Sequence, residues 1–385
     1  MKKIAVVCTL YGPHGGTGRV TTEIMERYAA DGNEVHVFCP ECDERFLENS
    51  AVTCLHKLKV TNIGVLKQLD LLLKASIAVK PKDYDIVYAT GDYHIKPDIV
   101  TIHTLKKYGR KTIEALEKTG ELEKTTDWIK DLLRKVYCPL IFELGEQFVY
   151  RRSNTKFICV SAGVKRNFCD EFHADSQKVA VIPNAISFEE YSYKQAARDR
   201  IRQDLCISES QKVVLFVGSD WKRKRLDTAI KVISNFPQLL LIVAGHDDPV
   251  SYQELAKKLG CNQRVLFVGF RNDINDFYSA ADYFLFTSVY ETFGLVALEA
   301  MAAGLVVISN KLNGVEDYIE NGVNGYLTEN ASEEAFTDVF RQILSSKELE
   351  FSIKNNATIT AKMNNWDNCY MQYKQIFDTY QRGKK

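Results

Sequence analysis

The sequence lacks a net charge and lacks long apolar runs. Its 50 lysines and arginines balance 50 aspartates and glutamates over 385 residues, which argues against a nucleic-acid-binding protein. No stretch approaches the ~18 consecutive apolar residues of a membrane span, and the apolar run after Met1 is too short for a secretory signal. There is also no long polar tract, so a disordered chain is excluded. We expect a cytoplasmic, globular protein.

The ten cysteines show no paired metal-ligand pattern. Cys8 and Cys159 lie inside apolar runs, as reduced and buried thiols of a cytoplasmic protein do. Cys39 and Cys42 form one C-x-x-C motif, but a zinc site needs a second ligand pair at matched spacing, and none follows. We therefore predict no metal site, and we interpret this motif as a strand end and a loop.

Short β-branched runs alternate with amphipathic helical stretches along the whole chain. This pattern builds parallel sheets through βαβ crossovers. The length exceeds the roughly 250–300 residues at which a single hydrophobic core stops growing, so we predict an α/β protein with two Rossmann-like, doubly wound parallel-sheet domains. The expected strands are Ile4–Thr9, Glu34–Cys39, Ile86–Ala89, Ile99–His103 and Lys156–Ser161, then Val213–Val217, Leu239–Ala244, Val265–Val268, Tyr283–Thr287, Val306–Ser309 and Gly325–Leu327.

Pro183 and Asn184 interrupt an apolar run within residues 181–193, so we place the interdomain linker there. The N-terminal domain then covers 1–183 and the C-terminal domain covers 184–365. The remaining residues, 366–385, carry an apolar stripe at helical spacing and predict a final helix that packs on one of the domains.

Glu299 is the single charged residue between Thr292 and Val307, in an Ala- and Leu-rich helix. A carboxylate there is costly unless it is paired or hydrogen-bonded, and a vicinal diol such as a ribose would suit it. Glu291 comes before the helix, where we expect Thr292 to be the cap and Gly294 to let a ligand approach the backbone. The amides of the helix start would bind an anion such as a diphosphate. The alternative is that Glu299 pairs with a core arginine and that Glu291 is solvated.

Two further loops follow predicted strands. Gly218 follows the first strand of the second series, and Arg223 and Lys224 come next, just before a helix. Such cations are usual partners of diphosphate oxygens, although a solvated basic turn is the alternative. Gly15 and Gly16 precede the first helix and would let a ligand come close, but Thr21 replaces the third glycine of a dinucleotide fingerprint.

Together these motifs resemble family 4 of the GT-B glycosyltransferases over nearly the whole chain, and the S-D-W-K-R-K segment is similar to the lipopolysaccharide-core glucosyltransferases. The resemblance implies two domains around a central cleft, with the final helix crossing back to the N-terminal domain. It also implies a retaining glycosyltransferase of polysaccharide biosynthesis, which takes a nucleotide sugar (we favour a UDP-sugar) and transfers the sugar to a glycan or lipid-linked acceptor.

The resemblance also assigns roles to residues. Glu291 and Glu299 match the family's E-x7-E acids, the first near the donor sugar and the second on the ribose. The amides of Phe293, Gly294 and Leu295 would hold sugar and phosphate oxygens. The predicted catalytic residues are His103, Arg223, Lys224 and Glu291, and the predicted donor-binding residues are Gly15, Gly16, Gly218, Arg223, Lys224, Phe293, Gly294, Leu295 and Glu299.

The family implies no cofactor and no metal. A metal-binding D-x-D would fit Asp83-Tyr-Asp85, but this motif precedes a strand, and we interpret it as a helix-to-strand loop. Two alternatives to transfer stay open: a sugar-nucleotide epimerase or hydrolase with the same fold, and a non-catalytic nucleotide-sugar-binding protein.

Residues 56–80 interleave lysines with leucines and isoleucines. This basic amphipathic pattern predicts weak peripheral association with the inner face of an anionic membrane that carries the acceptor. A core-facing apolar stripe with solvated lysines is the alternative. The residues concerned are Lys57, Lys59, Lys67, Lys74 and Lys80, with Leu66, Leu69, Leu72, Leu73 and Ile77.

Overall fold

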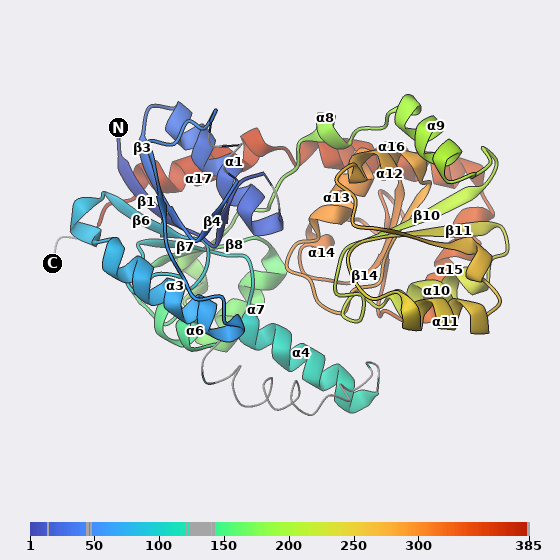
Figure 1. Cartoon of the computed structure of the whole chain (residues 1–385), viewed down its shortest axis with the longest axis horizontal. Coiled ribbons are helices and arrows are strands. Elements are labelled where there is room, and N and C mark those ends of the chain that lie inside the picture. Colours follow the sequence, from blue (N-terminus) through green and yellow to red (C-terminus); the bar gives the residue numbers. More distant parts are fainter. Residues whose placement is uncertain are drawn as a thin grey trace. The chain divides into compact units, whose positions relative to one another are not determined.

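The chain divides into two compact units, each built around a parallel sheet (Figure 1). The computed structural model describes residues 1–13, 15–43, 46, 48–120, 122, 140 and 143–382. The first unit comprises Met1–Ala185 and Trp366–Lys385, and the second comprises Ile186–Asn365. The first unit thus continues two residues beyond the expected boundary at 183. The predicted class, two Rossmann-like parallel-sheet domains, is confirmed.

Within the described residues, the sheet of the first unit has the strand order β5-β3-β1-β6-β7-β8-β9, and all neighbours are parallel. The central strands are fully buried, as expected for a sheet that helices cover on both faces. The strands are β1 (Lys3–Val7), β3 (Glu34–Cys39), β5 (Cys54–Lys57), β6 (Ile86–Ala89), β7 (Ile99–Ile102), β8 (Lys156–Cys159) and β9 (Val179–Val181), beside a separate pair, β2 (Leu10–Tyr11) and β4 (Glu41–Cys42).

The C-terminal helix α17 belongs to the first unit and packs against α1 (Figure 1). Phe377 makes an edge contact with Tyr28, and the Tyr370 hydroxyl donates to Asp31 at 2.6 Å. The apolar stripe predicted for this segment is therefore a packing surface. The helices of this unit are α1 (Gly16–Ala30), α3 (Gly64–Ala78), α4 (Lys106–Thr119), α6 (Leu144–Val149), α7 (Ala162–Phe172) and α17 (Trp366–Thr379).

The sheet of the second unit has the order β12-β11-β10-β13-β14-β15, again parallel throughout. Its core joins apolar side chains of the strands and of the covering helices, among them Leu241, Ile230 and Phe340. The strands are β10 (Lys212–Val217), β11 (Leu239–Ala244), β12 (Val265–Gly269), β13 (Tyr283–Phe286), β14 (Val306–Asn310) and β15 (Tyr326–Thr328). The helices are α8 (Phe188–Tyr191), α9 (Gln195–Asp204), α10 (Leu226–Ser234), α11 (Val250–Lys258), α12 (Ile274–Ala280), α13 (Leu295–Ala302), α14 (Val315–Tyr318), α15 (Glu333–Leu344) and α16 (Lys347–Met363).

The expected strands all form, with ends that shift by one or two residues. The structure adds the short strands β5 and β9 to the first sheet, and it adds the separate two-residue strands β2 and β4. Cys42, expected in a loop, therefore lies in β4. Asp83 ends a single 3-10 turn (Pro81–Asp83), and Asp85 accepts a hydrogen bond from the Lys3 amide at 2.8 Å, so the D-x-D segment is the predicted helix-to-strand loop. Among the described residues, no helix has both the length and the apolar character needed to cross a membrane.

Candidate functional site

The strand order of the second unit reverses between β10 and β13. In open parallel sheets the loops that leave the carboxyl ends of two such strands diverge, and ligands bind in the crevice between them. The loop after β10 carries Gly218, Arg223 and Lys224, and the loop after β13 carries Glu291 and Gly294. The topology therefore brings the two predicted motifs to one end of one sheet.

Arg223 and Lys224 converge on one carboxylate oxygen of Glu291. The Arg223 Nη1 and Lys224 Nζ atoms lie 3.0 and 3.1 Å from Glu291 Oε1, and the Ser288 hydroxyl donates to the same oxygen at 3.1 Å. Burial by itself disfavours the charged carboxylate, but the Lys224 and Arg223 charges outweigh it and hold the pKa of Glu291 below its ordinary value. Glu291 is therefore an ion-paired carboxylate and not a solvated one.

Further contacts fix the two cations, through backbone groups for Arg223 and an aromatic ring for Lys224. Arg223 Nη1 also donates to the Tyr290 carbonyl at 2.6 Å, and the Val289 amide donates to the Arg223 carbonyl at 3.0 Å. The Lys224 Nζ atom lies 4.9 Å from the centre of the Phe286 ring, a favourable cation–π distance. The cations are held in place before any ligand arrives, which lowers the entropic cost of binding an anion.

Gly218 is required where it stands. Its φ is +134°, and a Cβ atom there would lie 2.3 Å from Lys224 Cε. Any side chain at this position would push the lysine away. Trp221, which no sequence motif pointed to, donates its indole N–H to the Gly218 carbonyl at 2.8 Å and so stabilises the turn.

Helix α13 begins at Leu295, with Gly294 at the N-cap in the left-handed region (φ +83°) and without a side-chain cap. The prediction that Thr292 caps this helix is therefore wrong. A Cβ at Gly294 would lie 2.9 Å from Val315, so the tight packing as well as the φ angle selects glycine. The Tyr318 hydroxyl donates to the Gly294 carbonyl at 2.9 Å, and its ring packs on buried Phe293. The Ala297 amide donates to the Gly294 carbonyl at 2.9 Å and so closes the first turn.

Glu299 lies on α13, about one turn beyond this start, and is half-buried. The hydroxyl of buried Tyr278 donates to Glu299 Oε2 at 2.8 Å. The predicted strong partner thus exists and is a tyrosine, a residue that sequence reasoning missed because it lies 21 positions away on α12. The hydrogen bond orients the carboxylate.

In the first unit the strand order reverses between β1 and β6. Gly15 is the N-cap of α1 with φ +73°, Gly16 begins the helix, and both are exposed. His103 follows β7 and is buried, and its Nε2 atom has no hydrogen-bond partner among the residues that the structure describes. Burial lowers the pKa of His103 to about 4, so the imidazole is neutral at pH 7. An unpartnered buried nitrogen is costly and is consistent with a ligand contact.

Three titratable residues with buried side chains lie on the loops and helices after β6 and β7 and were missed from the sequence. Lys106 Nζ lies 2.8 Å from both oxygens of Asp92, and the Lys106 amide donates to Glu146 at 2.7 Å. Burial and the Asp92 charge raise the pKa of Glu146 to about 8. A Cβ at Gly145 would lie 2.1 Å from Asp92, so this glycine makes room for the ion pair. The spacing of these residues along the chain gives no signal that they would meet.

Two family models match the chain over most of its length. The model of the Glycosyl transferases group 1 family matches residues 197–360, and that of Glycosyltransferase Family 4 matches residues 14–190. The chain belongs to these glycosyltransferases, as its E-x7-E motif predicted.

Curated relatives give the same family. The lipopolysaccharide glucosyltransferase WaaG of Escherichia coli K12 is 30% identical over 213 residues, which are 53% of this chain and 57% of WaaG. The N-acetyl-α-D-glucosaminyl L-malate synthase of Bacillus anthracis is 25% identical over 364 residues, 92% of this chain and 91% of that enzyme. The chain therefore spans little more than half the length of WaaG in the first of these matches.

Solved structures share the fold. The crystal structure of WaaG has a TM-score of 0.81 at 24% identity and covers 98% of this chain and 100% of WaaG. The Anabaena HepE structure in complex with UDP and glucose has a TM-score of 0.74 at 20% identity, with 99% and 100% covered. These likenesses confirm the predicted GT-B architecture of two Rossmann-like domains.

Proposed function

We propose that the protein transfers a sugar, with retention of anomeric configuration, from a UDP-sugar to a glycan or glycolipid acceptor. The observation that carries the proposal is the pair of cations, Arg223 and Lys224, held on Glu291 beside the start of α13. A preformed positive site next to helix-start amides stabilises the diphosphate that departs when the glycosidic bond to the donor breaks, and this is usually the largest catalytic contribution. Two similar proteins support the choice of UDP: the Anabaena HepE protein, solved in complex with UDP-glucose, and a galactosyltransferase of E. coli that uses UDP-galactose.

Each remaining site residue has a role in this proposal. Glu299, oriented by Tyr278, accepts hydrogen bonds from the ribose hydroxyls. The amides of Phe293, Gly294 and Leu295 and the loop at Gly15 and Gly16 contact sugar and phosphate oxygens. His103 is neutral at pH 7 and uses its unpartnered Nε2 to contact the donor sugar rather than to carry charge. The site employs no metal, because side-chain cations and amides supply the positive charge.

The test has two readouts. Thermal stability is measured with UDP-, GDP- and ADP-glucose, and a ligand at ~100 times its dissociation constant adds ~2.7 kcal/mol. The product anomer is then determined by NMR with a glycolipid acceptor panel. We expect stabilisation by UDP-glucose and a retained anomer. An inverted sugar, or release without acceptor, would favour an epimerase or hydrolase, and binding without any turnover would favour a nucleotide-sugar-binding protein.

We also propose weak peripheral association with a membrane through α3. Leu71, Leu72 and Ala75 of this helix are buried, whereas Leu73 and Ile77 are 48% and 75% exposed. Lys67 and Lys74 pair with Glu41 and Asp70, so they contribute less attraction to anionic lipid than the sequence pattern suggests. The exposed apolar side chains support the proposal, because α3 keeps such a surface besides its core-facing stripe.

Flotation with anionic vesicles tests this association. We expect the wild type to float at low salt and a Leu73→Ser, Ile77→Ser double variant to float less. The matched control is Ile359→Ser, which removes a 59% exposed apolar side chain from the second unit. Absence of flotation at low salt would leave the acceptor recognised without a membrane contact, and equal flotation of all variants would show that α3 is not the surface that binds the vesicles.

A further inference from the structure

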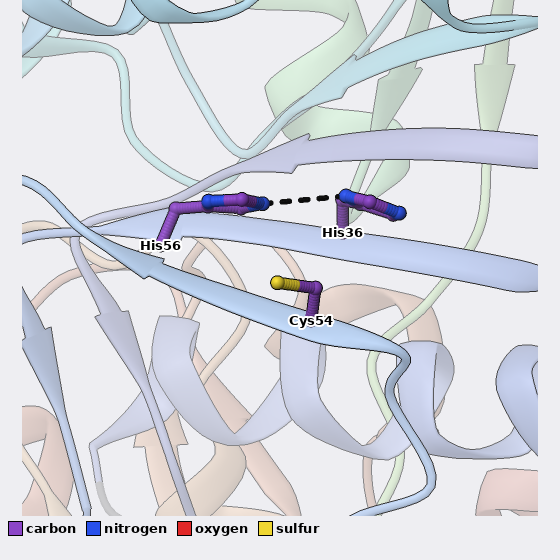
Figure 2. A group of neighbouring side chains, drawn as sticks. All are labelled: His36, Cys54 and His56. Carbon is purple, nitrogen blue, oxygen red and sulfur yellow. Dashed lines mark hydrogen bonds between the residues drawn. The ribbon is translucent and has the colours of Figure 1, made fainter.

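Two histidines and a cysteine meet at the edge of the first sheet (Figure 2). His36 lies on β3, and Cys54 and His56 lie on the neighbouring edge strand β5. In the parallel register His36 pairs with Cys54, and Phe38 pairs with His56. Because alternate residues of a strand face the same side, Cys54 and His56 share one face of β5, next to His36. Three side chains with metal-binding atoms are therefore neighbours on one face of the sheet.

The distances fit a tetrahedral metal ion. His36 Nδ1 and His56 Nε2 are 3.3 Å apart, and the ligand atoms of all three residues lie within 4.8 Å of one another. Zinc–nitrogen bonds of about 2.0–2.1 Å at tetrahedral angles place two nitrogens about 3.3–3.4 Å apart, and a zinc–sulfur bond of about 2.3 Å places the sulfur about 3.6 Å from each. The two nitrogens are already at this separation, and only small side-chain rotations would bring the sulfur to its place.

The groups around the cluster orient the ligands as in metal sites. The second ring nitrogen of His36, Nε2, lies 2.8 Å from Glu34 Oε1, and Lys3 pairs with the same carboxylate at 2.8 Å. A carboxylate that accepts the other N–H of a histidine fixes the tautomer whose free lone pair faces the metal. The His56 ring stacks on Phe38 with centroids 4.2 Å apart and planes 9° apart, which limits its rotation.

A histidine–histidine hydrogen bond alone is a weaker explanation. At 3.3 Å the two nitrogens are farther apart than the 2.9–3.0 Å typical of N–H donors, and such a bond gives no role to the Cys54 thiol or to Glu34. All three side chains are only half-buried, so an ion can reach them from solvent.

We propose that His36, Cys54 and His56 bind one divalent transition metal ion of the zinc class, with a water molecule as fourth ligand. Two imidazoles and one thiolate are a donor set that suits zinc, whereas magnesium and calcium prefer oxygen ligands. The ion would join the edge strand β5 to β3 and so protect an exposed sheet edge. The site goes beyond the proposed transfer reaction, whose cations lie in the second unit.

The C-x-x-C motif takes no part in this site. The described residues contain one group of metal-ligating side chains, and neither Cys39 nor Cys42 belongs to it. Cys39 lies at an odd position of β3 and His36 at an even one, so their side chains face opposite sides of the sheet. Cys39 is buried, and its thiol contacts Cys8.

The test uses the full-length chain, stripped of metal with a chelator and titrated with Co²⁺. We expect one equivalent to bind, with the visible absorbance of tetrahedral cobalt and a thiolate-to-cobalt charge-transfer band, and we expect Zn²⁺ to displace it. Cys54→Ser should abolish the charge-transfer band. Cys54→Ser and His56→Gln should each weaken Co²⁺ binding more than about 100-fold, because losing only a residue that hydrogen-bonds to a ligand already lowers metal affinity about 10–100-fold. Glu34→Gln should fall in that smaller range.

The matched control is Cys206→Ser, which removes an exposed thiol from the second unit and should leave the cobalt spectrum and affinity unchanged. Circular dichroism checks that each variant is folded. The proposal is overturned if the folded wild type binds no Co²⁺ saturably, or if Cys54→Ser and His56→Gln bind it with the wild-type affinity. None of these readouts depends on sugar transfer.

Discussion

Replacing Glu291 with Gln tests whether this carboxylate holds two cations in readiness for a diphosphate. The variant keeps the shape of the side chain and one acceptor oxygen but loses the negative charge that faces Arg223 and Lys224. Without it, Lys224, whose side chain is 9% exposed, becomes a buried charge with a neutral partner. We expect the second unit to become less stable while the cations become freer to bind an anion.

The magnitude follows from the contacts. Glu291 accepts two hydrogen bonds from charged donors, at 3.0 and 3.1 Å. Hydrogen bonds to charged groups contribute about 1.5–3 kcal/mol each, against about 1 kcal/mol for neutral pairs. The substitution should therefore lower the free energy of unfolding by about 2–3 kcal/mol. For a unit of this size that corresponds to a fall in Tm of about 5–10 °C.

The pH dependence has a definite sign. The pKa of folded Glu291 lies below its ordinary value of 4.5, so the unfolded chain binds the proton first as pH falls. The difference in free energy of unfolding between wild type and Glu291→Gln is therefore fully present above pH 4.5, and it disappears as the pH falls through the pKa of folded Glu291. Thermal unfolding of both proteins over this pH range measures the difference.

UDP binding, measured by calorimetry, provides the second readout. We expect Glu291→Gln to bind UDP at least as tightly as the wild type, although it transfers sugar more slowly. Glu254→Gln, on an exposed face of α11, is the charge-matched control and should change neither property. An unchanged Tm in Glu291→Gln, or UDP affinity lost from a folded variant, would refute the reasoning.

Three further predictions concern the site. Glu299→Ala should abolish UDP affinity in calorimetry, while Glu299→Gln should keep part of it, because an amide still accepts one hydrogen bond from a ribose hydroxyl. Unchanged UDP affinity in a folded Glu299→Ala variant would remove this residue from the site. Transfer should continue in excess EDTA, since basic side chains replace the metal, and complete loss that Mg²⁺ or Mn²⁺ restores would contradict this. Between pH 4 and 6.5 the unfolded chain binds a proton at His103 that the folded protein does not, so wild-type stability should rise with pH there, and His103→Gln should show a smaller rise.

The fold was largely predictable because buried parallel strands are apolar and short, and the helices between them are amphipathic. Strand β5 was not predicted, because its four residues, Cys-Leu-His-Lys, do not form an apolar run. A strand at the edge of a sheet does not need to be buried on both faces. The cap of α13 was predicted wrongly at Thr292. Sequence preference favours threonine at a cap, but the close packing against Val315 and the positive φ require glycine at that point.

The sequence by itself determined the fold class, the family and the identity of the main candidate residues, because these depend on local periodicity and on motifs within a few turns of chain. Only the tertiary structure decided which side chains meet. Arg223 and Glu291 are 68 positions apart, and Glu299 finds Tyr278 on another helix. His36 joins Cys54 and His56 through the register of two strands, a pairing that no spacing along one strand encodes. Such contacts depend on strand order and register, which the packing of the whole sheet sets.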